Sequence, residues 1–381
     1  MLILPPLSLY IHIPWCVQKC PYCDFNSHAL KHDIPEQEYI DALLQDLDAD
    51  LHFAQGRKLH SIFIGGGTPS LISPESIGRL LAGVQQRLPF EDDIEITLEA
   101  NPGTVEAGRF GGFQRAGVNR ISIGVQSFQP DKLKRLGRIH DPAQARFAAQ
   151  EAAGVGLNSF NIDLMHGLPE QRLEDALYDL EQALALAPPH LSWYQLTIEP
   201  NTPFASRPPA LPEDDTLADI YERGHALLLA HGYQQYEVSA YAKPGFEARH
   251  NLNYWRFGDY LGIGCGAHGK ITLPLQGRIL RTVKVKHPRG YLDSNRPYLD
   301  QHWHIAAQDL SLEYFMNRLR LFEPIPCHEF TGLTGQPLTQ LQAPLAEAYR
   351  LELLENTGTH WQVTPLGRRF LNRLLDLFLE E

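Results

Sequence analysis

Short runs of β-branched and aromatic residues recur through the first half of the chain, and each is followed by a stretch long enough for a helix. Six runs are expected to be strands, at residues 7–13, 60–67, 93–101, 119–126, 159–167 and 190–198. Apolar residues between them recur at helical spacing, as at Leu173, Leu177, Leu180 and Leu184. Because right-handed crossovers return the chain to the same sheet edge, this alternation predicts parallel strands. It is compatible with an open doubly wound sheet and with an incomplete (βα) barrel.

The alternation ends in a proline-rich segment, EPNTPFASRPPALPEDD at residues 199–215, which does not suit a helix interior or a central strand. We therefore expect a first domain at residues 1–215. Residues 216–300 contain a helix, strand-like runs and a glycine-rich turn, and we expect them to extend the sheet. Residues 301–381 are mainly helical and end in two short strands around a turn and a helix, the outline of a winged helix.

Charge and cysteine content limit the functions open to the chain. Its 381 residues carry a formal net charge of −12, which opposes attraction to nucleic acid, so the winged-helix-like region is expected to pack or dock. The N-terminus lacks a signal peptide and no apolar run approaches the roughly 20 residues that span a bilayer, so we expect a cytoplasmic protein. Five cysteines, three of them crowded together, favour a metal site over a disulfide framework in that compartment.

The three crowded cysteines, Cys16, Cys20 and Cys23, follow the first strand with the spacing C-x3-C-x2-C. Three thiolates on one loop can hold three corners of a [4Fe–4S] cube, whose fourth iron is then open to a small molecule. The alternative is a structural zinc ion, which needs four ligands. The fourth ligand would then be His12, Asp24 or His28. Because zinc sites usually show paired cysteines, the spacing favours the cluster.

This cysteine motif resembles the signature of the radical S-adenosylmethionine superfamily. The resemblance implies a six-unit partial (βα) barrel in which S-adenosylmethionine chelates the open iron of the cluster. A glycine-rich segment, GGGTPS at residues 65–70, follows the second strand, where it forms either a tight turn or a close backbone approach to a ligand. By the resemblance, Gly66, Gly67 and Thr68 lie along the methionine part of S-adenosylmethionine.

Further polar and aromatic residues stand on or beside the predicted strands, most of them near the edge at which parallel sheets and barrels place ligands. For each polar residue taken alone, a solvated loop position or a supporting role is the alternative. Their amide, carboxylate and guanidinium groups suit the hydroxyl, ammonium and carboxylate groups of the cofactor. The resemblance assigns these positions to S-adenosylmethionine binding: Tyr10, Tyr22, Glu99, Gln126, Arg138 and Asp163.

A second motif lies in ARHNLNYWRFGDYLGIGCGAHG, at residues 248–269. It resembles the HNxxYW element of the haem chaperones, one branch of the oxygen-independent coproporphyrinogen III oxidase-like proteins, and the likeness covers nearly the whole chain. By that resemblance His250 ligates haem iron, while Tyr254 and Trp255 stack on the macrocycle. From the residues alone, the expectation is that His250 is a histidine whose hydrogen bonds are made within the protein, beside two aromatic side chains of the core. The alternative haem ligands are Cys265 and His268.

Two departures separate the chain from the porphyrinogen-oxidising members of that branch. Phe25 stands where they carry a further cysteine, and only six residues precede the first strand, where they carry an extension. Cys327 lies outside every motif and is expected to be a buried apolar side chain.

We therefore expect a haem chaperone that carries a [4Fe–4S] cluster and S-adenosylmethionine, without porphyrinogen turnover. The expected partners are haem, acceptor haemoproteins at the inner face of the membrane and a second copy of the chain, and not nucleic acid. The alternative function is that of an oxygen-independent coproporphyrinogen III dehydrogenase, which decarboxylates a porphyrinogen by radical chemistry.

Overall fold

The barrel of the protein is built from the predicted alternation of strands and helices. A computed structural model describes residues 2–379, without the side chains of residues 104–105. The barrel strands are β1 (Leu7–Ile13), β4 (Leu59–Gly66), β5 (Phe90–Ala100), β6 (Arg120–Gln126), β7 (Ser159–His166) and β8 (His190–Gln195). The helices between them are α1 (Glu36–Asp50), α2 (Pro74–Arg87), α3 (Thr104–Ala107), α4 (Phe110–Arg115), α5 (Pro130–Arg135), α6 (Pro142–Gly154) and α7 (Leu173–Ala185).

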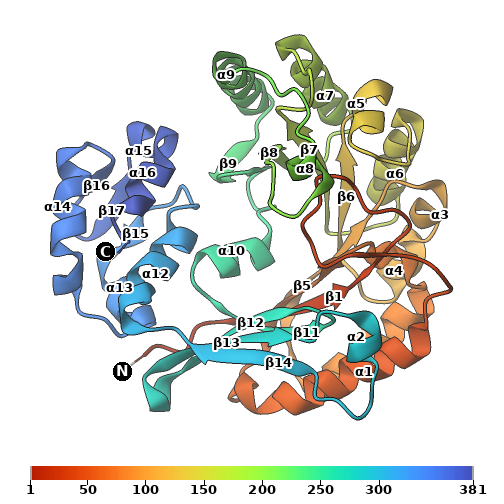
Figure 1. Ribbon diagram of the computed structural model, residues 1–381, viewed down its shortest axis with the longest axis horizontal. Coiled ribbons are helices and arrows are strands. Elements are labelled where there is room, and N and C mark those ends of the chain that lie inside the picture. Colours follow the sequence, from red (N-terminus) through yellow and green to blue (C-terminus); the bar gives the residue numbers. More distant parts are fainter. Residues whose placement is uncertain (1, 380–381) are drawn as a thin grey trace.

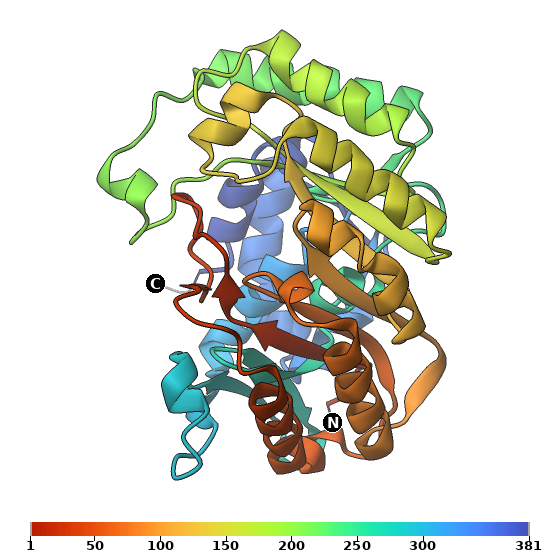
Figure 2. The same ribbon diagram turned by 90° about the vertical axis from the view of Figure 1, so that its right-hand side faces the viewer.

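The order of these strands decides between the two architectures that the sequence pattern allows. Neighbours in the sheet follow chain order, β1-β4-β5-β6-β7-β8, and every adjacent pair is parallel. A doubly wound sheet reverses its strand order at a switch point, and these six strands do not. The sheet curves into an open arc with its helices on the outer side (Figures 1 and 2). The predicted partial barrel is therefore confirmed.

Burial on both faces explains why most barrel strands read as apolar runs, whereas the first half of β5 is acidic and only partly buried or exposed. In β1, every residue except Tyr10 is buried, because the outer helices cover one face and the interior of the arc covers the other. The helix starts are set locally. Ser73 caps α2 by accepting a hydrogen bond from the Ser76 N–H, and Asp141 forms a capping box with Gln144 at the start of α6.

The middle of the chain extends this sheet at both ends, as expected. After α8 (Pro203–Ser206) and α9 (Asp214–Ala230), β10 (Ala240–Ala242) pairs antiparallel with β8, and β9 (Gln234–Glu237) pairs antiparallel with β10. On the other side β11 (Asp259–Gly264) pairs parallel to β1. Strands β12 (His268–Leu273), β13 (Arg278–Lys284) and β14 (Leu299–His304) follow antiparallel, with α11 (Pro288–Tyr291) before β14. The result is one twelve-stranded sheet, and α10 (Arg249–Trp255) contacts β4 and β1.

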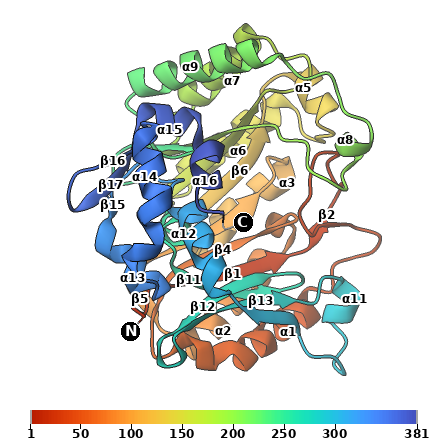
Figure 3. The same ribbon diagram turned by 60° about the vertical axis from the view of Figure 1, so that its left-hand side comes forward.

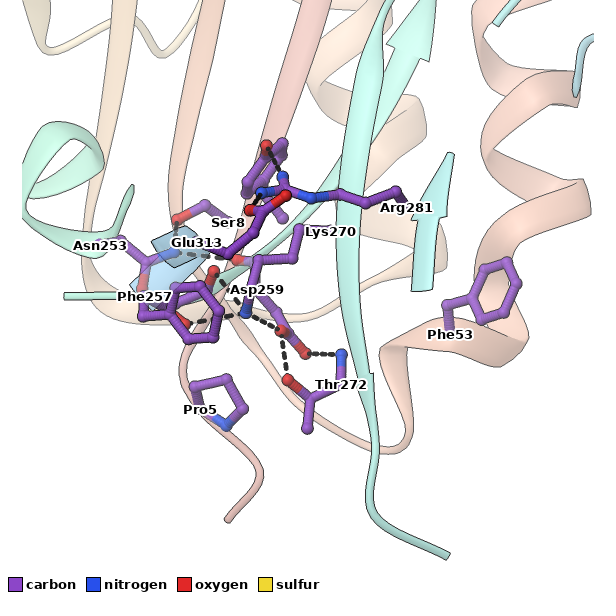
Figure 4. Close-up of polar contacts among 12 residues, drawn as sticks. Pro5, Ser8, Phe53, Asn253, Phe257, Asp259, Lys270, Thr272, Arg281 and Glu313 are labelled. Atoms are coloured by element: carbon purple, nitrogen blue, oxygen red, sulfur yellow. Dashed lines mark hydrogen bonds and ion pairs between the residues drawn. The ribbon is translucent and has the colours of Figure 1, made fainter. Parts of the chain in front are cut away.

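Two buried ionic networks fasten the extension to the barrel. Asp259, with no exposed surface, accepts hydrogen bonds from Lys270 at 3.2 Å and from Thr272 at 2.8 Å (Figure 4). It also accepts a hydrogen bond from Arg57 at 2.8 Å. Burial lowers the pKa of Lys270, against the opposing effect of the Asp259 carboxylate.

In the second network, Lys284 bonds to Asp46 at 2.5 Å and to Asp50 at 2.7 Å, both on the core face of α1. Pairing offsets the large cost of removing these charges from water, so each network needs all of its members.

The C-terminal region packs around its own aromatic core and lies opposite the inner side of the arc (Figures 1 and 3). Its elements are α12 (Leu310–Arg318), β15 (Ile325–Pro326), α13 (Cys327–Thr334), α14 (Gln342–Arg350), β16 (Leu354–Asn356), β17 (His360–Val363), α15 (Pro365–Arg369) and α16 (Leu371–Asp376). Phe315 stacks on Phe378 with ring centroids 3.8 Å apart. The predicted pair of short strands and following helix are present. Within residues 2–379, no helix combines the length and apolar character needed to cross a membrane.

Candidate functional site

The cysteine loop connects β1 to α1 and is closed at its base by a small parallel ribbon. Strands β2 (Trp15–Cys16) and β3 (His28–Ala29) pair across the loop, so Cys20 and Cys23 project from the segment between them. A turn in which the Cys23 N–H donates to the Cys20 carbonyl at 3.2 Å holds these two cysteines near each other. All three are free thiols, and burial raises the pKa of Cys16 and of Cys23.

The glycine segment after β4 is attached directly to this loop. The Gly67 N–H donates to the Ile13 carbonyl and the Thr68 N–H to the Trp15 carbonyl, both at 2.7 Å. A β-carbon at Gly67 would lie 2.5 Å from the Trp15 carbonyl oxygen, closer than any real contact of that kind. Glycine is therefore required at this position by the approach of two backbones, in addition to any ligand that they bind.

A cavity of about 300 Å³, which we call the cysteine cavity, opens beside this loop. It is lined by the three cysteines and by all but one of the residues predicted to bind S-adenosylmethionine. These are Cys16, Cys20, Cys23, Tyr22, Gly66, Gly67, Thr68, Glu99, Gln126, Arg138 and Asp163. The exception is Tyr10, whose hydroxyl is hydrogen-bonded to His12 and whose ring lines the neighbouring cavity described below.

Two carboxyl groups, those of Glu99 and Asp163, line the cysteine cavity. Glu99 accepts a hydrogen bond from the Gly66 N–H at 3.0 Å, and Asp163 accepts from Asn161 at 2.7 Å and from Ser122 at 3.2 Å. Burial and the charge of Asp163 raise the pKa of Glu99 to about 8, and burial also raises the pKa of Asp163. Without a cation between them, this pair resists full ionisation. A ligand ammonium group would relieve that repulsion.

Arg138 links the cysteine loop to the ends of two barrel strands. Its guanidinium donates to the Asn101 side chain at 2.8 Å and to the Gly124 carbonyl at 2.6 Å, and it lies 3.7 Å from the Cys20 sulfur. Its Nε has no hydrogen-bond partner in the part of the chain that the structure describes. The predicted role of Arg138 as a fork for a ligand carboxylate therefore competes with a role in positioning the Cys20 thiol.

Gln126 ends β6 in a left-handed backbone conformation, with φ of 69°. Its side-chain oxygen accepts a hydrogen bond from the Tyr194 hydroxyl at 2.8 Å. Such a conformation is costly for a residue other than glycine, and it turns the amide toward the cavity only because the surrounding contacts hold it there.

The donor set of the cysteine cavity fits an iron–sulfur cluster. Across residues 2–379, no group of three or more His, Cys, Asp or Glu side chains converges closely enough to hold a single metal ion. A cluster does not need that convergence, because each thiolate binds a different iron atom.

A second and larger cavity, of about 1020 Å³, adjoins the first and shares Lys19, Phe25, Ser27, Gly66 and Glu99 with it. We call it the aromatic cavity. Its rings come from the barrel, the cysteine loop, α10 and β11, and are Tyr10, Phe25, Phe63, Tyr254, Trp255 and Tyr260. Four cations also line it: Lys19, Lys270, Arg281 and Lys286. Only two acidic side chains, Asp24 and Glu99, lie on the same wall. Asp259 pairs with Lys270 and Glu313 pairs with Arg281, so Lys19 and Lys286 are the cations of this wall that bond to no carboxylate within residues 2–379, and they favour an anionic ligand.

The HNxxYW element forms most of α10, and its members face different surroundings. Tyr254 and Trp255 line the aromatic cavity. His250 is not on its wall. The His250 side chain is 1% exposed, its Nδ1 lies 3.0 Å from the Ser61 hydroxyl, and its ring stacks on Phe63 at 5.0 Å. Burial lowers the pKa of His250 to about 3. His250 packs against Phe63 and Tyr254 in this structure, and its role as a haem ligand stays a prediction.

The two alternative haem ligands, His268 and Cys265, also lie in different surroundings. His268 is exposed and lines the aromatic cavity. Cys265 is fully buried and donates from its thiol to the Lys286 carbonyl at 3.0 Å, so it holds the turn between β11 and β12. Cys327 is only half-buried, at the edge of the C-terminal core, because it begins α13 at the surface of that region.

Sequence reasoning missed several residues of both cavities. In the cysteine cavity these are Asn101, Ser122, Gly124 and Tyr194, each at or near the end of a predicted strand. In the aromatic cavity they are chiefly the four cations. For Arg281 and Lys286 the available signal was the density of basic residues in RILRTVKVK at residues 278–286, whereas Lys19 and Lys270 lie outside that segment.

Comparison with known proteins agrees with this geometry. Residues 10–180 match the radical SAM superfamily model, and residues 305–370 match the HemN C-terminal domain. The chain is 63% identical over 381 residues to heme chaperone HemW of Escherichia coli, covering 100% of both chains. It is 61% identical to heme chaperone HemW of Haemophilus influenzae, covering 99% of both.

Among solved structures, coproporphyrinogen III oxidase (HemN) from Escherichia coli superposes with a TM-score of 0.83 at 24% identity, covering 98% of this chain and 90% of that one. That likeness establishes the shared fold. The matches to the two relatives extend over 99–100% of the chain. The chain therefore belongs to the HemW family of the radical SAM superfamily.

Proposed function

We propose that this chain is a haem chaperone, which binds haem in the aromatic cavity and delivers it to acceptor haemoproteins. The observation that carries the proposal is the cavity of about 1020 Å³ with aromatic walls and four cations, next to the cysteine cavity. Haem is a flat apolar macrocycle with two carboxylates. Aromatic side chains suit the macrocycle, and cations suit the carboxylates. The names of the relatives and the size and chemistry of the cavity support this proposal.

The cysteine cavity is proposed to hold the cluster and S-adenosylmethionine. Cys16, Cys20 and Cys23 would bind three irons of a [4Fe–4S] cluster, which supplies an electron to S-adenosylmethionine when both are bound. Glu99 and Asp163 would then pair with the ligand ammonium, and the backbone at Gly66 and Gly67 would approach the methionine part.

His268 is the proposed axial ligand of the haem iron, since it lies on the cavity wall. His12 and His28 also line this cavity, but each already bonds to a backbone carbonyl, that of Asn26 at 2.9 Å and that of Lys286 at 3.3 Å. His250 could reach the cavity only after Phe63 or Tyr254 moved, because both rings pack against it.

A paired assay tests the function. Anaerobically reconstituted and reduced protein, given S-adenosylmethionine and coproporphyrinogen III, should form no protoporphyrinogen IX, because Phe25 supplies no thiol beside the cavities. The same protein should bind about one haem per chain. His268→Ala should alter the Soret band more than His250→Ala does. Turnover of the porphyrinogen, or haem binding no tighter than to an unrelated acidic protein, would replace the chaperone with a dehydrogenase.

A further test addresses the cluster. Replacing Cys16, Cys20 or Cys23 by Ala should abolish the roughly four irons expected per chain after reconstitution. Cys327→Ala is the matched control, because Cys327 lies in the C-terminal region, and it should retain them. Stoichiometric zinc without sulfide in anaerobically purified protein would exclude the cluster.

A further inference from the structure

Arg281 is a cation of the aromatic cavity whose present partner comes from a different part of the chain. It lies on β13 and lines the cavity, with its guanidinium donating to the Tyr260 hydroxyl at 2.8 Å. The other side of the guanidinium forms an ion pair with Glu313 (Figure 4). The two side chains are 18% and 29% exposed, so both are largely removed from water.

Glu313 belongs to α12, the helix that begins the C-terminal region. The same helix contributes Asn317 to the wall of the aromatic cavity, one turn further on. Helix α12 also contacts α10, which carries Tyr254 and Trp255. The ion pair between Arg281 and Glu313 therefore joins the sheet to the C-terminal region at the edge of the cavity.

The bonding of Glu313 differs from that of Asp259, the carboxylate that pairs with Lys270 of the aromatic cavity. Asp259 pairs with Lys270 and also accepts hydrogen bonds from Arg57 and Thr272 in a buried network. If Asp259 moved away, these three residues would lose their hydrogen-bond acceptor in a buried environment. Within residues 2–379, the Glu313 carboxylate bonds only to Arg281. The Glu313 carboxylate is partly exposed, so water can solvate it when it leaves Arg281. Glu313 is thus an exchangeable partner and Asp259 a fixed one.

We propose that Arg281 binds a carboxylate of the macrocycle, and that Glu313 occupies Arg281 when the cavity is empty. This inference rests on the proposed function. A guanidinium fork matches a carboxylate from either source, so the exchange keeps Arg281 paired in both states. Binding of haem then releases Glu313 and breaks an ion pair between β13 and α12. Occupancy of the cavity is in this way communicated to the C-terminal region, which an acceptor protein can contact.

The exchange makes a prediction opposite to that for an ordinary structural ion pair. Because Glu313 competes with the ligand for Arg281, Glu313→Gln should increase the affinity for haem, by about five- to tenfold, the lower part of the usual range of coupling between sites. Arg281→Gln should decrease the affinity, and Arg281→Lys should restore it only in part, since lysine lacks the fork. In the double variant Arg281→Gln/Glu313→Gln, the gain from Glu313→Gln should disappear.

The test is a haem titration of the full-length protein and these variants, followed through the Soret band. Glu347→Gln removes an exposed carboxylate partner of Arg350 in the same region and should leave the affinity unchanged. Iron protoporphyrin IX dimethyl ester, which has no free carboxylates, should bind the wild type and Glu313→Gln equally. Circular dichroism establishes that each variant is folded.

The outcomes separate the two levels of the proposal. If the wild type binds no haem, the proposed function itself fails. If the wild type binds haem but Glu313→Gln binds it no more tightly, or if the gain survives in the double variant, then Glu313 does not compete for Arg281 and this inference is overturned.

Discussion

Glu99 gives the sharpest test of the site, because its behaviour follows from position and needs no ligand. The carboxyl group lies between the two cavities, near Asp163, and its pKa is raised from 4.5 to about 8. The perturbation is Glu99→Gln, which preserves the shape of the side chain and an oxygen for the Gly66 N–H but removes the ionisation.

The sign of the pH dependence follows from linkage. Between pH 4.5 and about 8 the folded protein holds a proton on Glu99 that the unfolded chain has lost, so the free energy of unfolding falls as the pH rises through that window. Each unit of pKa shift corresponds to about 1.4 kcal/mol. From pH 5 to pH 8 the wild type should therefore lose about 3 kcal/mol of stability relative to Glu99→Gln.

Urea denaturation of the two proteins at half-unit intervals from pH 5 to pH 8 measures this difference. Glu181→Gln, which removes an exposed carboxylate from α7, is the matched control and should follow the wild type. Asp163→Asn should reduce the loss, because Asp163 is one cause of the raised pKa of Glu99. Parallel curves for the wild type and Glu99→Gln would refute the burial and repulsion described for this site.

Four further outcomes are expected. The affinity for S-adenosylmethionine, measured by calorimetry, should rise with pH up to about 8 in the wild type and not in Glu99→Gln, because pairing with an ammonium requires the ionised carboxylate. Arg138→Ala should weaken the same binding by about 1.5 to 3 kcal/mol, and unchanged affinity would leave Arg138 a positioning residue of the cysteine loop. Trp255→Leu should weaken haem binding by about three- to tenfold in a Soret titration, through loss of aromatic stacking, and an unaltered titration would remove Trp255 from the haem site. Lys284→Met should destabilise the protein toward urea by about 3 to 5 kcal/mol, because it leaves two buried carboxylates without their cation. Arg350→Met, which removes an exposed ion pair, should have no measurable effect. Equal effects of the two substitutions would contradict the burial of the Lys284 network.

The fold was readable from the sequence wherever burial is continuous. Most of the barrel strands are apolar because both faces of the sheet are covered, and all six were predicted within a few residues. Strand β14 was not predicted, because LDQHWH lies at the edge of the sheet with most of its side chains exposed and shows no apolar pattern. The predicted leucine face of α7 was also inexact. Leu180 is fully buried, but Asp179 beside it is buried too, where it accepts from the Ser127 hydroxyl at 2.7 Å.

In the site, too, the features that depend on local sequence pattern were predicted, whereas those that depend on tertiary contacts were not. The cysteines and the glycine segment could be placed together because both follow neighbouring strands at one edge of the sheet. The surroundings of His250 could not be predicted, since its position depends on how α10 packs on Phe63 of β4, far away in sequence. Arg281 was missed for a similar reason, because a cation in a strand reveals its partner, Glu313, only once the C-terminal region is in place.

The central position of β1 has a consequence for the synthesis of the chain. One edge of β1 pairs with β4, which follows closely, but the other pairs with β11, made about 250 residues later. At ribosomal rates of roughly 5 to 20 residues per second, that second edge lacks its partner for on the order of 10 to 50 s. An unpaired apolar strand such as LSLYIHI is a template for pairing with other chains. The middle of the finished sheet is thus an open edge until residues 259–264 have been made.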